Sequence, residues 1–364
     1  LFRSAMKPVF SAAKRGTRKR ICFSEGEEER VLRAAQIVLD EGLAQPILIG
    51  RPSVIQQRIE RFGLRLTEGV DYQVVNVEND HRYRDFWQTY HRMTERKGVT
   101  QQLAKIDMRR RLTLIGCMMV HKGEADGLIC GTWSTPDAHL HYVDQVIGLR
   151  PGVSTYACMN ALLLPERQVF LVDTHINYDP SAEQLAEITI MAAEEMKRFG
   201  VEPKAALLSH SNFGSSNHPT ALKMRRTLAL VQAQAPWLEI DGEMHGDVAI
   251  DTPARQSLMP HSTLHANANL LVFPNLDAAN ITYNLLKTAA GGNIALSLVR
   301  PIGFLKVSAG DISPDGRLIL LRSGNNAAVW SRAVRQSVGD AFGTAAAPAP
   351  VIGEPMELNG ESIA

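Results

Sequence analysis

The sequence predicts an α/β protein built from two domains, and three observations support this class. The chain has 364 residues, which is the length of about two ordinary domains. From residue 20 onward, short apolar runs alternate with stretches of helical periodicity, which is typical of strand and helix units around a mostly parallel sheet. The pattern begins again after Arg150-Pro151-Gly152. Because proline and glycine interrupt helices and strands, this segment favours a domain boundary.

The composition fits a folded globular chain. Hydrophobic residues make up 45% and charged residues 21%, so a disordered chain or a fibre is excluded. The formal net charge is +1, and we therefore expect no nucleic-acid and no membrane partner. The longest strongly apolar stretches, such as residues 112–120, are too short to span a membrane. Four cysteines without a CxxC pair favour a reducing compartment, and we expect a cytoplasmic location.

The first domain is expected over residues 19–152, after a linker at 1–18. Because the chain starts at Leu1, we expect it to be part of a longer polypeptide. Residues 1–20 carry seven basic side chains and no acid, which we interpret as a solvated linker rather than a transit peptide or a nucleic-acid arm. The expected strands are 21–23, 46–49 and 127–130, and the expected helices are 27–40, 52–62 and two or three within 84–121.

The second domain is expected over residues 153–290. Its clearest element is a helix over 181–199, which begins with the capping box Ser181-Ala182-Glu183-Gln184 and ends at Gly200. The expected strands are the apolar runs 154–164, 168–172, 204–208, 238–240 and 270–273.

The pattern changes from about residue 294. The turn at 313–316 and the runs at 317–321 and 328–330 predict a hairpin, so 311–343 is a divergent, hairpin-like segment. The alanine, proline and glycine content of 344–364 predicts a disordered tail.

Two polar loops follow buried strands and are the candidate binding sites. Residues 209–217 lie between a strand and a helix that begins near Pro219 or Thr220, and residues 131–137 follow the strand that ends at Cys130. Hydroxyl groups, small residues and helix-start amides at the carboxyl end of a parallel strand can surround a phosphate or a thioester. The alternative is a pair of polar loops that only cap helices.

The other polar motifs give weaker evidence for a binding or catalytic site. Glu27, Glu28 and Glu29 after the turn at 24–26 are expected to cap a helix, since carboxylates there would repel phosphate. A metal site at residues 137–144 is disfavoured, because His139 and His141 are two positions apart and would not share a helix face; a solvated face is expected. The absence of GxGxxG, Walker and GxSxG motifs gives no support for a dehydrogenase, kinase or serine hydrolase.

Several ordered motifs together resemble the phosphate acetyl/butyryltransferase family over residues 19–295. They are Phe23-Ser24-Glu25-Gly26, Pro46-Ile47-Leu48-Ile49-Gly50, Ala125-Asp126-Gly127-Leu128-Ile129, Ser134-Thr135-Pro136-Asp137, Asp241-Gly242-Glu243, Phe273-Pro274-Asn275-Leu276 and Asn280-Ile281-Thr282-Tyr283. Residues 6–10 and 26–34 are most similar to the carboxyl-terminal half of bacterial NADP-dependent malic enzymes.

The resemblance implies two α/β domains of the phosphotransacetylase type, an isocitrate/isopropylmalate-dehydrogenase-like fold, with coenzyme A in the cleft between them. It implies that the chain completes the first domain over about 291–310, with a strand at 295–299, and that dimers form through the second domain. NADP and a divalent metal would belong only to a preceding malic-enzyme part. The residues implied to contact acetyl-CoA are Ser134, Thr135, Ser209, Ser211, Gly214, Ser215 and Asn280.

The sequence departs from the family at the groups that an active enzyme uses. Leu140 stands where the family's phosphate-holding arginine is expected. Lys306 and Val307 stand where a serine and an arginine are expected, and a shift to Ser308 still leaves Ala309 for the arginine. Losing one such charge-stabilising donor lowers turnover by about 10²- to 10³-fold. The sequence therefore favours an acetyl-CoA-binding regulatory module, with an active acyltransferase or an oligomerisation scaffold as alternatives.

Overall fold

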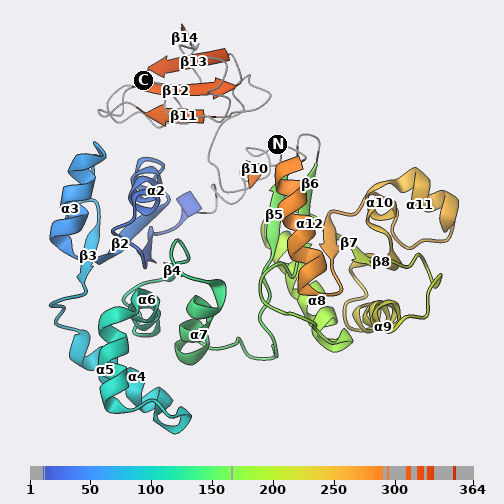
Figure 1. The fold of residues 1–364 in the computed structure, drawn as a ribbon, viewed down its shortest axis with the longest axis horizontal. Coiled ribbons are helices and arrows are strands. Elements are labelled where there is room, and N and C mark those ends of the chain that lie inside the picture. Colours follow the sequence, from blue (N-terminus) through green and yellow to red (C-terminus); the bar gives the residue numbers. More distant parts are fainter. Residues whose placement is uncertain are drawn as a thin grey trace. The chain divides into compact units, whose positions relative to one another are not determined.

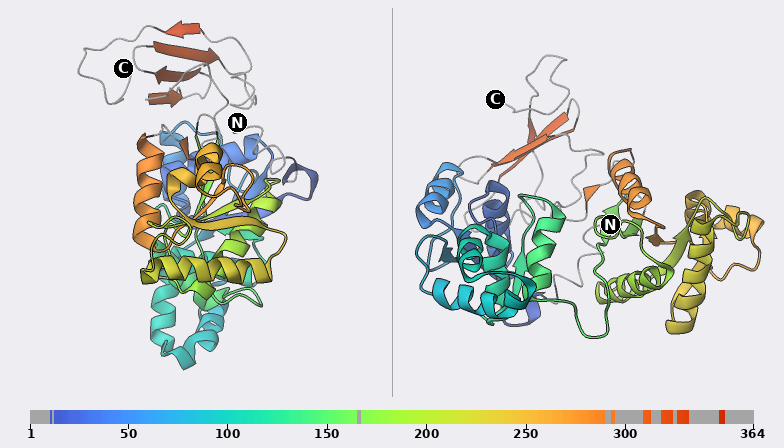
Figure 2. Two further views of the ribbon diagram at one scale, coloured as in Figure 1. Left: turned by 90° about the vertical axis from the view of Figure 1, so that its right-hand side faces the viewer. Right: turned by 60° about the horizontal axis from the view of Figure 1, so that its bottom comes forward.

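The computed structural model describes residue 11, residues 13–164 and 167–289, and five short strands after residue 292. The described residues up to 148 belong to one compact unit and those between 149 and 294 to another; we call these two segments the N-terminal unit and the central unit. The elements of each are drawn in Figures 1 and 2. Both units are α/β, as the sequence predicts.

The N-terminal unit contains a parallel sheet in the order β3-β2-β1-β4. Its strands are β1 (Lys19–Phe23), β2 (Ala44–Gly50), β3 (Gln73–Asn76) and β4 (Gly127–Ile129). Its helices are α2 (Glu29–Asp40), α3 (Pro52–Arg61), α4 (Tyr83–Thr94), the 3₁₀ helix η1 (Glu95–Lys97), α5 (Gln101–Arg110), α6 (Leu112–His121) and α7 (Pro136–Val146).

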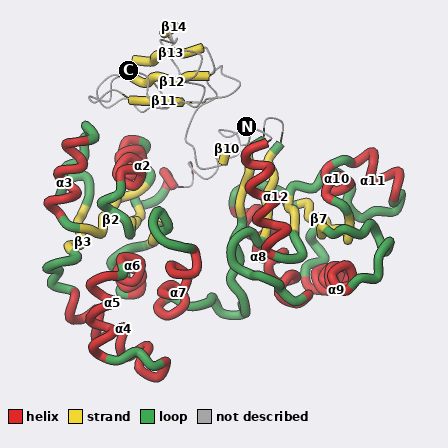
Figure 3. The backbone as a smooth tube through the Cα atoms, viewed as in Figure 1, coloured by secondary structure: helices red, strands yellow, loops and turns green. Residues whose placement is uncertain are grey.

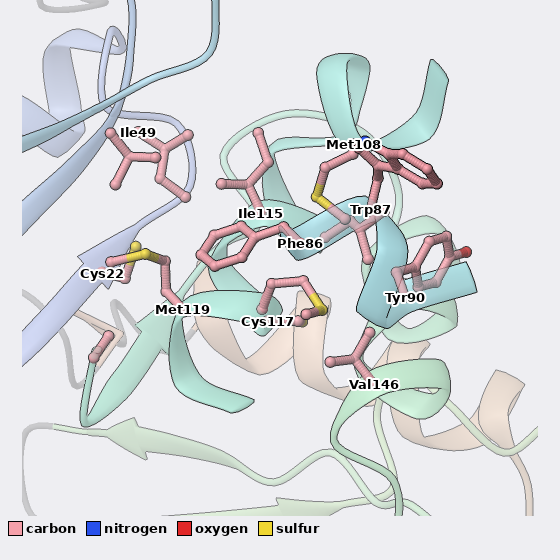
Figure 4. Close-up of a cluster of buried hydrophobic side chains, with 14 of the residues drawn as sticks. Cys22, Ile49, Phe86, Trp87, Tyr90, Met108, Ile115, Cys117, Met119 and Val146 are labelled. Atoms are coloured by element: carbon pink, nitrogen blue, oxygen red, sulfur yellow. The ribbon is translucent and has the colours of Figure 1, made fainter. Parts of the chain in front are cut away.

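Helices cover both faces of this sheet. Successive strand side chains point to opposite faces, so Leu48 packs with the buried residues of α2 and α3, whereas Ile47 and Ile49 pack with those of α4 to α6. The second cluster is shown in Figure 4, with Phe86 and Met119 among its members. Because neither face is solvated, the strands are short continuous apolar runs rather than alternating ones.

The central unit contains a mixed sheet in the order β10-β5-β6-β9-β7-β8. The strands are β5 (Asn160–Leu163), β6 (Gln168–Val172), β7 (Lys204–Leu208), β8 (Glu239–Met244), β9 (Leu270–Val272) and β10 (Asn293–Ile294). The helices are α8 (Ala182–Arg198), α9 (Pro219–Gln234), α10 (Gly246–Ile250), α11 (Thr252–Leu258) and α12 (Leu276–Ala289), visible as red segments in Figure 3. Strands β6, β9, β7 and β8 are parallel, and β5 and β10 are antiparallel additions.

Alternate residues of the central strands again serve two cores. Leu207 and Val272 pack with α8 and α9, whereas Ala206 and Leu271 pack with α10 and α12. Helix α8 begins with the capping box predicted from the sequence, in which the Ser181 hydroxyl accepts from the Gln184 amide and the Gln184 side chain accepts from the Ser181 amide. The cap places the start of the helix where its apolar face meets the sheet.

Several segments differ from their predicted assignment. Strand β3 was not predicted, because only two of its four residues, Val74 and Val75, are apolar. Only Asn160–Leu163 of the predicted strand 154–164 is a strand. Strand β10 pairs with β5 of the central unit, whereas the chain was expected to complete the first domain from about residue 291. The predicted strand 295–299 lies outside the described residues.

The end of the chain contains antiparallel strands. Strands β12 (Leu318–Ser323) and β13 (Asn326–Ser331) pair at the place where the sequence predicts a hairpin. Strand β11 (Ala309–Ile312) pairs with β12, and β14 (Ala347–Ala349) pairs with β13. Thus β14 is a strand within the segment 344–364 that was expected to be disordered; the rest of that segment lies outside the described residues.

No helix in the described part of the chain is both long and apolar enough to cross a lipid bilayer.

A buried arginine holds the irregular part of the central unit together. Arg255 on α11 is fully buried and donates to the carbonyl oxygens of Val248, Ala249, Leu264 and Ala266 at 2.7–3.3 Å. A buried charge is tolerated when its donors are satisfied in this way. Arg255 therefore fixes α10, α11 and the loop before β9 to one another.

We expect Arg255→Ala to lower the free energy of unfolding by about 3 kcal/mol or more, because several buried carbonyl groups lose their partner at once. The matched control is Arg226→Ala, which removes an exposed ion pair with Glu183 and should cost less than about 1 kcal/mol. Urea denaturation of the full chain measures both. Equal losses for the two variants would show that Arg255 is not a structural centre.

Candidate functional site

A pocket of about 140 Å³ lies in the N-terminal unit, beside the carboxyl ends of β1 and β4 and the junction of α5 with α6. It is lined by Glu25, Arg110, Arg111, Leu112, Thr113, Trp133, Ser134, Ala138, His139 and Tyr142. The carboxyl ends of parallel strands are where ligands bind in open α/β sheets. This pocket contains one of the predicted binding residues, Ser134.

A histidine and a carboxylate form the inner wall of the pocket. His139 Nε2 bonds to the carbonyl oxygen of Trp133, so this nitrogen carries the ring proton, and Nδ1 accepts from the Thr113 hydroxyl at 2.7 Å. The Glu25 carboxylate is 4.0 Å from Nε2 and accepts from the Gly131 amide at 3.2 Å. His139 was expected on a solvated helix face, and this expectation is wrong, because only 13% of its side chain is exposed.

The lining of the pocket also contains two cationic side chains. Arg110 and Arg111, at the end of α5, are both exposed, and Arg111 Nε lies 3.8 Å from Asp107. Burial raises the pKa of the Tyr142 phenol, which therefore stays protonated and can donate a hydrogen bond. Guanidinium groups pair strongly with phosphate and carboxylate oxygens. The pocket can therefore accept an anionic group, although Glu25 opposes negative charge at its inner end.

The predicted residues Ser134 and Thr135 are both exposed. Ser134 has a φ of 73°, an uncommon conformation for a residue with a side chain, and Thr135 is the N-cap of α7. The Thr135 side chain makes no capping bond. Leu140 lies on the same helix and is partly buried, so no cation stands at the position where the family arginine was expected.

The loop after β7 contains four of the other predicted residues: Ser209, Ser211, Gly214 and Ser215. Ser211 is fully buried and donates to Glu243 Oε1 at 2.6 Å, and the Gly214 amide donates to the same oxygen at 2.9 Å. The Ser209 hydroxyl accepts from the Ser211 amide, and that of Ser215 accepts from the Asn212 amide. Ser211, the Gly214 amide and the Ser215 hydroxyl thus all have protein partners, and of the two serines only Ser215 is exposed.

The loop after β7 is bonded to Glu243, a residue of β8 that was not among the predicted site residues. Its side chain is fully buried at the end of β8, and its second oxygen, Oε2, lies 3.6 Å from Arg225 Nε. Neither of these two atoms has a hydrogen-bond partner, so the contact is a charge pair rather than a hydrogen bond. The signal in the sequence was an acid at the end of a strand that is otherwise buried.

Asn280, the last predicted binding residue, lies on α12. Its amide nitrogen donates to the Thr174 carbonyl at 3.1 Å, and its oxygen accepts from Asn284 at 3.1 Å. The Asn280 side chain therefore lies beside the loop that follows β6. The expectation that Ser134 and Thr135 face a common cleft with the residues of the central unit stays a prediction.

The acidic turn after β1 caps a helix, as expected. Glu28 is the N-cap of α2 and accepts from the amides of Arg30 and Val31, while Glu27 accepts from Arg51 at 2.8 Å. This hydrogen bond with Arg51 is the main reason that the pKa of Glu27 is lowered.

Within the described residues, no group of three or more histidine, cysteine, aspartate or glutamate side chains is arranged to hold a metal ion.

Comparison with known proteins identifies the family of this chain. A family model described as phosphate acetyl/butaryl transferase matches residues 4–313. The chain belongs to this family. Lys306, Val307 and Ser308, which were expected to align with the family's second signature, lie outside the described residues, and only the backbone strand is described at Ala309.

Curated relatives of two kinds share this family domain. The chain is 52% identical over 290 residues to an NAD-dependent malic enzyme of Rhizobium meliloti and 49% identical over 305 residues to an NADP-dependent malic enzyme of Escherichia coli. These matches cover 79% and 82% of the chain but only 38% and 40% of the relatives. A phosphate acetyltransferase of Nitratidesulfovibrio vulgaris is 34% identical over 301 residues, which are 82% of the chain and 42% of that protein.

Solved structures agree on the fold. A phosphotransacetylase from Streptococcus pyogenes matches with a TM-score of 0.73 and 28% identity, and the EutD phosphotransacetylase from Staphylococcus aureus matches with a TM-score of 0.71 and 26% identity. Each match covers 80% of this chain and 88% of the other. The α/β fold of the phosphotransacetylase type is therefore established.

We expect Glu243→Ala to destabilise the central unit by about 2 kcal/mol or more, because the buried Ser211 hydroxyl and the Gly214 amide lose their acceptor. The same substitution at Glu194, whose ion pair with Arg150 is exposed, should change stability by less than about 1 kcal/mol. Urea denaturation gives the two values. Hydrogen exchange should also become faster at the amides of residues 211–216, and unchanged exchange there would contradict the role of Glu243.

Proposed function

We propose that this chain is the phosphotransacetylase-like regulatory domain of a malic enzyme, that it binds acetyl-CoA as an effector, and that it does not transfer acyl groups itself. In this proposal the oxidative decarboxylation of malate to pyruvate, with NADP and a divalent metal, takes place in an N-terminal part of the same polypeptide. The proposal is supported by sequence identity of 52% and 49% to two malic enzymes, over 38% and 40% of the length of those proteins.

The observation that carries the proposal is Leu140. Acyl transfer between a thiolate and phosphate builds negative charge, and a preorganised cation stabilises that charge. On α7 an apolar side chain stands at the position where the family resemblance requires the arginine. A leucine contributes no charge stabilisation, so the transfer step loses a main source of its rate.

Binding can survive this loss, because it depends on different groups. The pocket beside Ser134 still has two guanidinium groups, supplied by Arg110 and Arg111 from α5 and the α5–α6 junction. These can pair with an anionic part of acetyl-CoA or coenzyme A. A ligand that binds one conformation better can shift a distant site by about 1 to 3 kcal/mol, which is sufficient for regulation.

The activity test measures acetyl phosphate formation from acetyl-CoA and phosphate. We expect turnover at least about 10²-fold below that of a phosphotransacetylase such as the Streptococcus pyogenes protein, and we expect Leu140→Arg alone not to restore it.

The binding test is thermal melting with millimolar acetyl-CoA. It should show stabilisation of the folded chain, about 2.7 kcal/mol at a hundredfold excess over the dissociation constant. The double variant Arg110→Ala/Arg111→Ala should lose this shift, and the surface variant Arg61→Ala should keep it.

The alternatives give different results. Turnover within about tenfold of the active enzyme would support an acyltransferase in which Arg110 and Arg111 replace the lost cation. No melting shift with either acetyl-CoA or coenzyme A would support an oligomerisation scaffold.

We also propose a homodimer, or an assembly of dimers, formed through the central unit. Helix α12 exposes 58% of Ile281 and 62% of Leu285, four positions apart and therefore on one face. Light scattering of the chain at micromolar concentration should give at least the mass of a dimer. The variant Ile281→Glu/Leu285→Glu should lower this mass if α12 contributes to the interface, and a monomer mass for the unaltered chain would reject the proposal.

A further inference from the structure

His139 is the imidazole in the lining of the pocket in the N-terminal unit. An imidazole is the side chain whose charge ordinarily changes between about pH 5 and 8, whereas a guanidinium keeps its charge throughout this range. The other titratable neutral group of the lining, the phenol of Tyr142, keeps its proton because burial raises its pKa. With 13% of its side chain exposed, the imidazole can exchange protons with solvent.

The contacts of His139 accommodate a second ring proton. In the neutral ring, Nε2 donates to the Trp133 carbonyl and Nδ1 accepts from the Thr113 hydroxyl at 2.7 Å. A proton on Nδ1 reverses this second bond, because a hydroxyl can also accept, and the Thr113 hydroxyl can then turn toward the Cys130 side chain, with which it also interacts. The Glu25 carboxylate, 4.0 Å from Nε2, favours the positive ring.

The other charges near the imidazole balance one another. They are the ion pair of Arg111 with Asp107 from α5, the ion pair of Arg30 with Glu28 at the start of α2, whose arginine reaches the Thr132 carbonyl, and the opposite charges of Arg110 and Glu25 in the lining. On α7 itself, Asp137, His141 and Asp144 are exposed and are two or five positions from His139, which places them on other faces of the helix. One proton on the imidazole therefore gives the pocket a net positive charge.

This added charge couples the proton to an anionic ligand. An anion that pairs with Arg110 or Arg111 in so small a pocket lies close to the imidazole and favours its charged form. The coupling is reciprocal, so the protonated ring must in turn favour the anion by the same factor. An opposite charge within about 4–6 Å shifts a pKa by about one unit or more, and one unit corresponds to about tenfold in affinity.

We propose that His139 takes up a proton when the pocket binds an anionic part of acetyl-CoA, so that the affinity for this ligand rises as the pH falls. The proton comes from solvent and is held on Nδ1, and no other bond is made or broken. The inference rests on the proposed function, since acetyl-CoA must bind in this pocket. It adds a regulation of that binding by pH.

The test is isothermal titration calorimetry of the full chain with acetyl-CoA between about pH 5.5 and 8. At each pH, two buffers with different enthalpies of protonation give the number of protons taken up on binding. We expect the dissociation constant to rise about tenfold across this range, with proton uptake on binding. The phosphate monoester of the ligand gains its second charge near about pH 6, which acts in the opposite direction and is common to every variant.

Variants identify the group that takes the proton. His139→Gln keeps an N–H donor for the Trp133 carbonyl and should remove the proton uptake. His121→Gln, at the exposed last residue of α6, should keep the uptake and the tenfold change. Glu25→Gln removes the carboxylate that favours the charged ring, so the rise in affinity should occur at a pH about one unit lower.

The outcomes separate this inference from the proposed function. Acetyl-CoA binding with equal proton uptake in the unaltered chain and in His139→Gln would overturn the inference and leave the proposed function in place. Loss of uptake in Glu25→Gln but not in His139→Gln would place the proton on Glu25 and would also overturn it. No binding at any pH would reject both. If circular dichroism shows that His139→Gln does not fold, an unchanged pH dependence in folded Glu25→Gln decides against the inference.

Discussion

The sheets of the N-terminal and central units are each covered by helices on both faces, and this constraint determines where polar chemistry can lie. In β2, Leu48 packs toward one helical layer while Ile47 and Ile49 pack toward the other, so neither face has room for a solvated side chain. The central strands show the same division between Leu207 and Ala206. The pocket and the loop at residues 209–217, which we call the serine loop, both lie beyond the strand ends.

Loops of similar composition have different roles because of what is buried beneath them. Beneath the serine loop lies the carboxylate of Glu243, and the loop folds around it, so Ser211 and the Gly214 amide complete an internal network. Beside the Ser134 loop, Arg110 and Arg111 line a pocket in which Ser134 is exposed. In the part of the chain that the structure describes, the second arrangement is the better suited to an anionic ligand.

Family membership and loss of a catalytic group are compatible because fold and chemistry depend on different residues. The fold requires apolar strands and capped helices, and Leu140 is a partly buried residue within the helix α7. The transfer chemistry requires a cation at one position. A single substitution there can remove activity and leave a folded domain available for binding, which is the basis of the regulatory role that we propose.

The sequence by itself determined the fold class, most strands and the start of α8, because these depend on local apolar patterns and on the capping box at Ser181. It also carried the family resemblance that the comparisons confirm. It could not determine that β10 joins β5, which is a choice between distant partners for a two-residue strand. Nor could it show that His139 turns inward to Thr113 and Trp133, or that Glu243 reaches under the serine loop. These contacts join residues 26 or more positions apart, or depend on the turn of a loop, and only tertiary packing brings such side chains together.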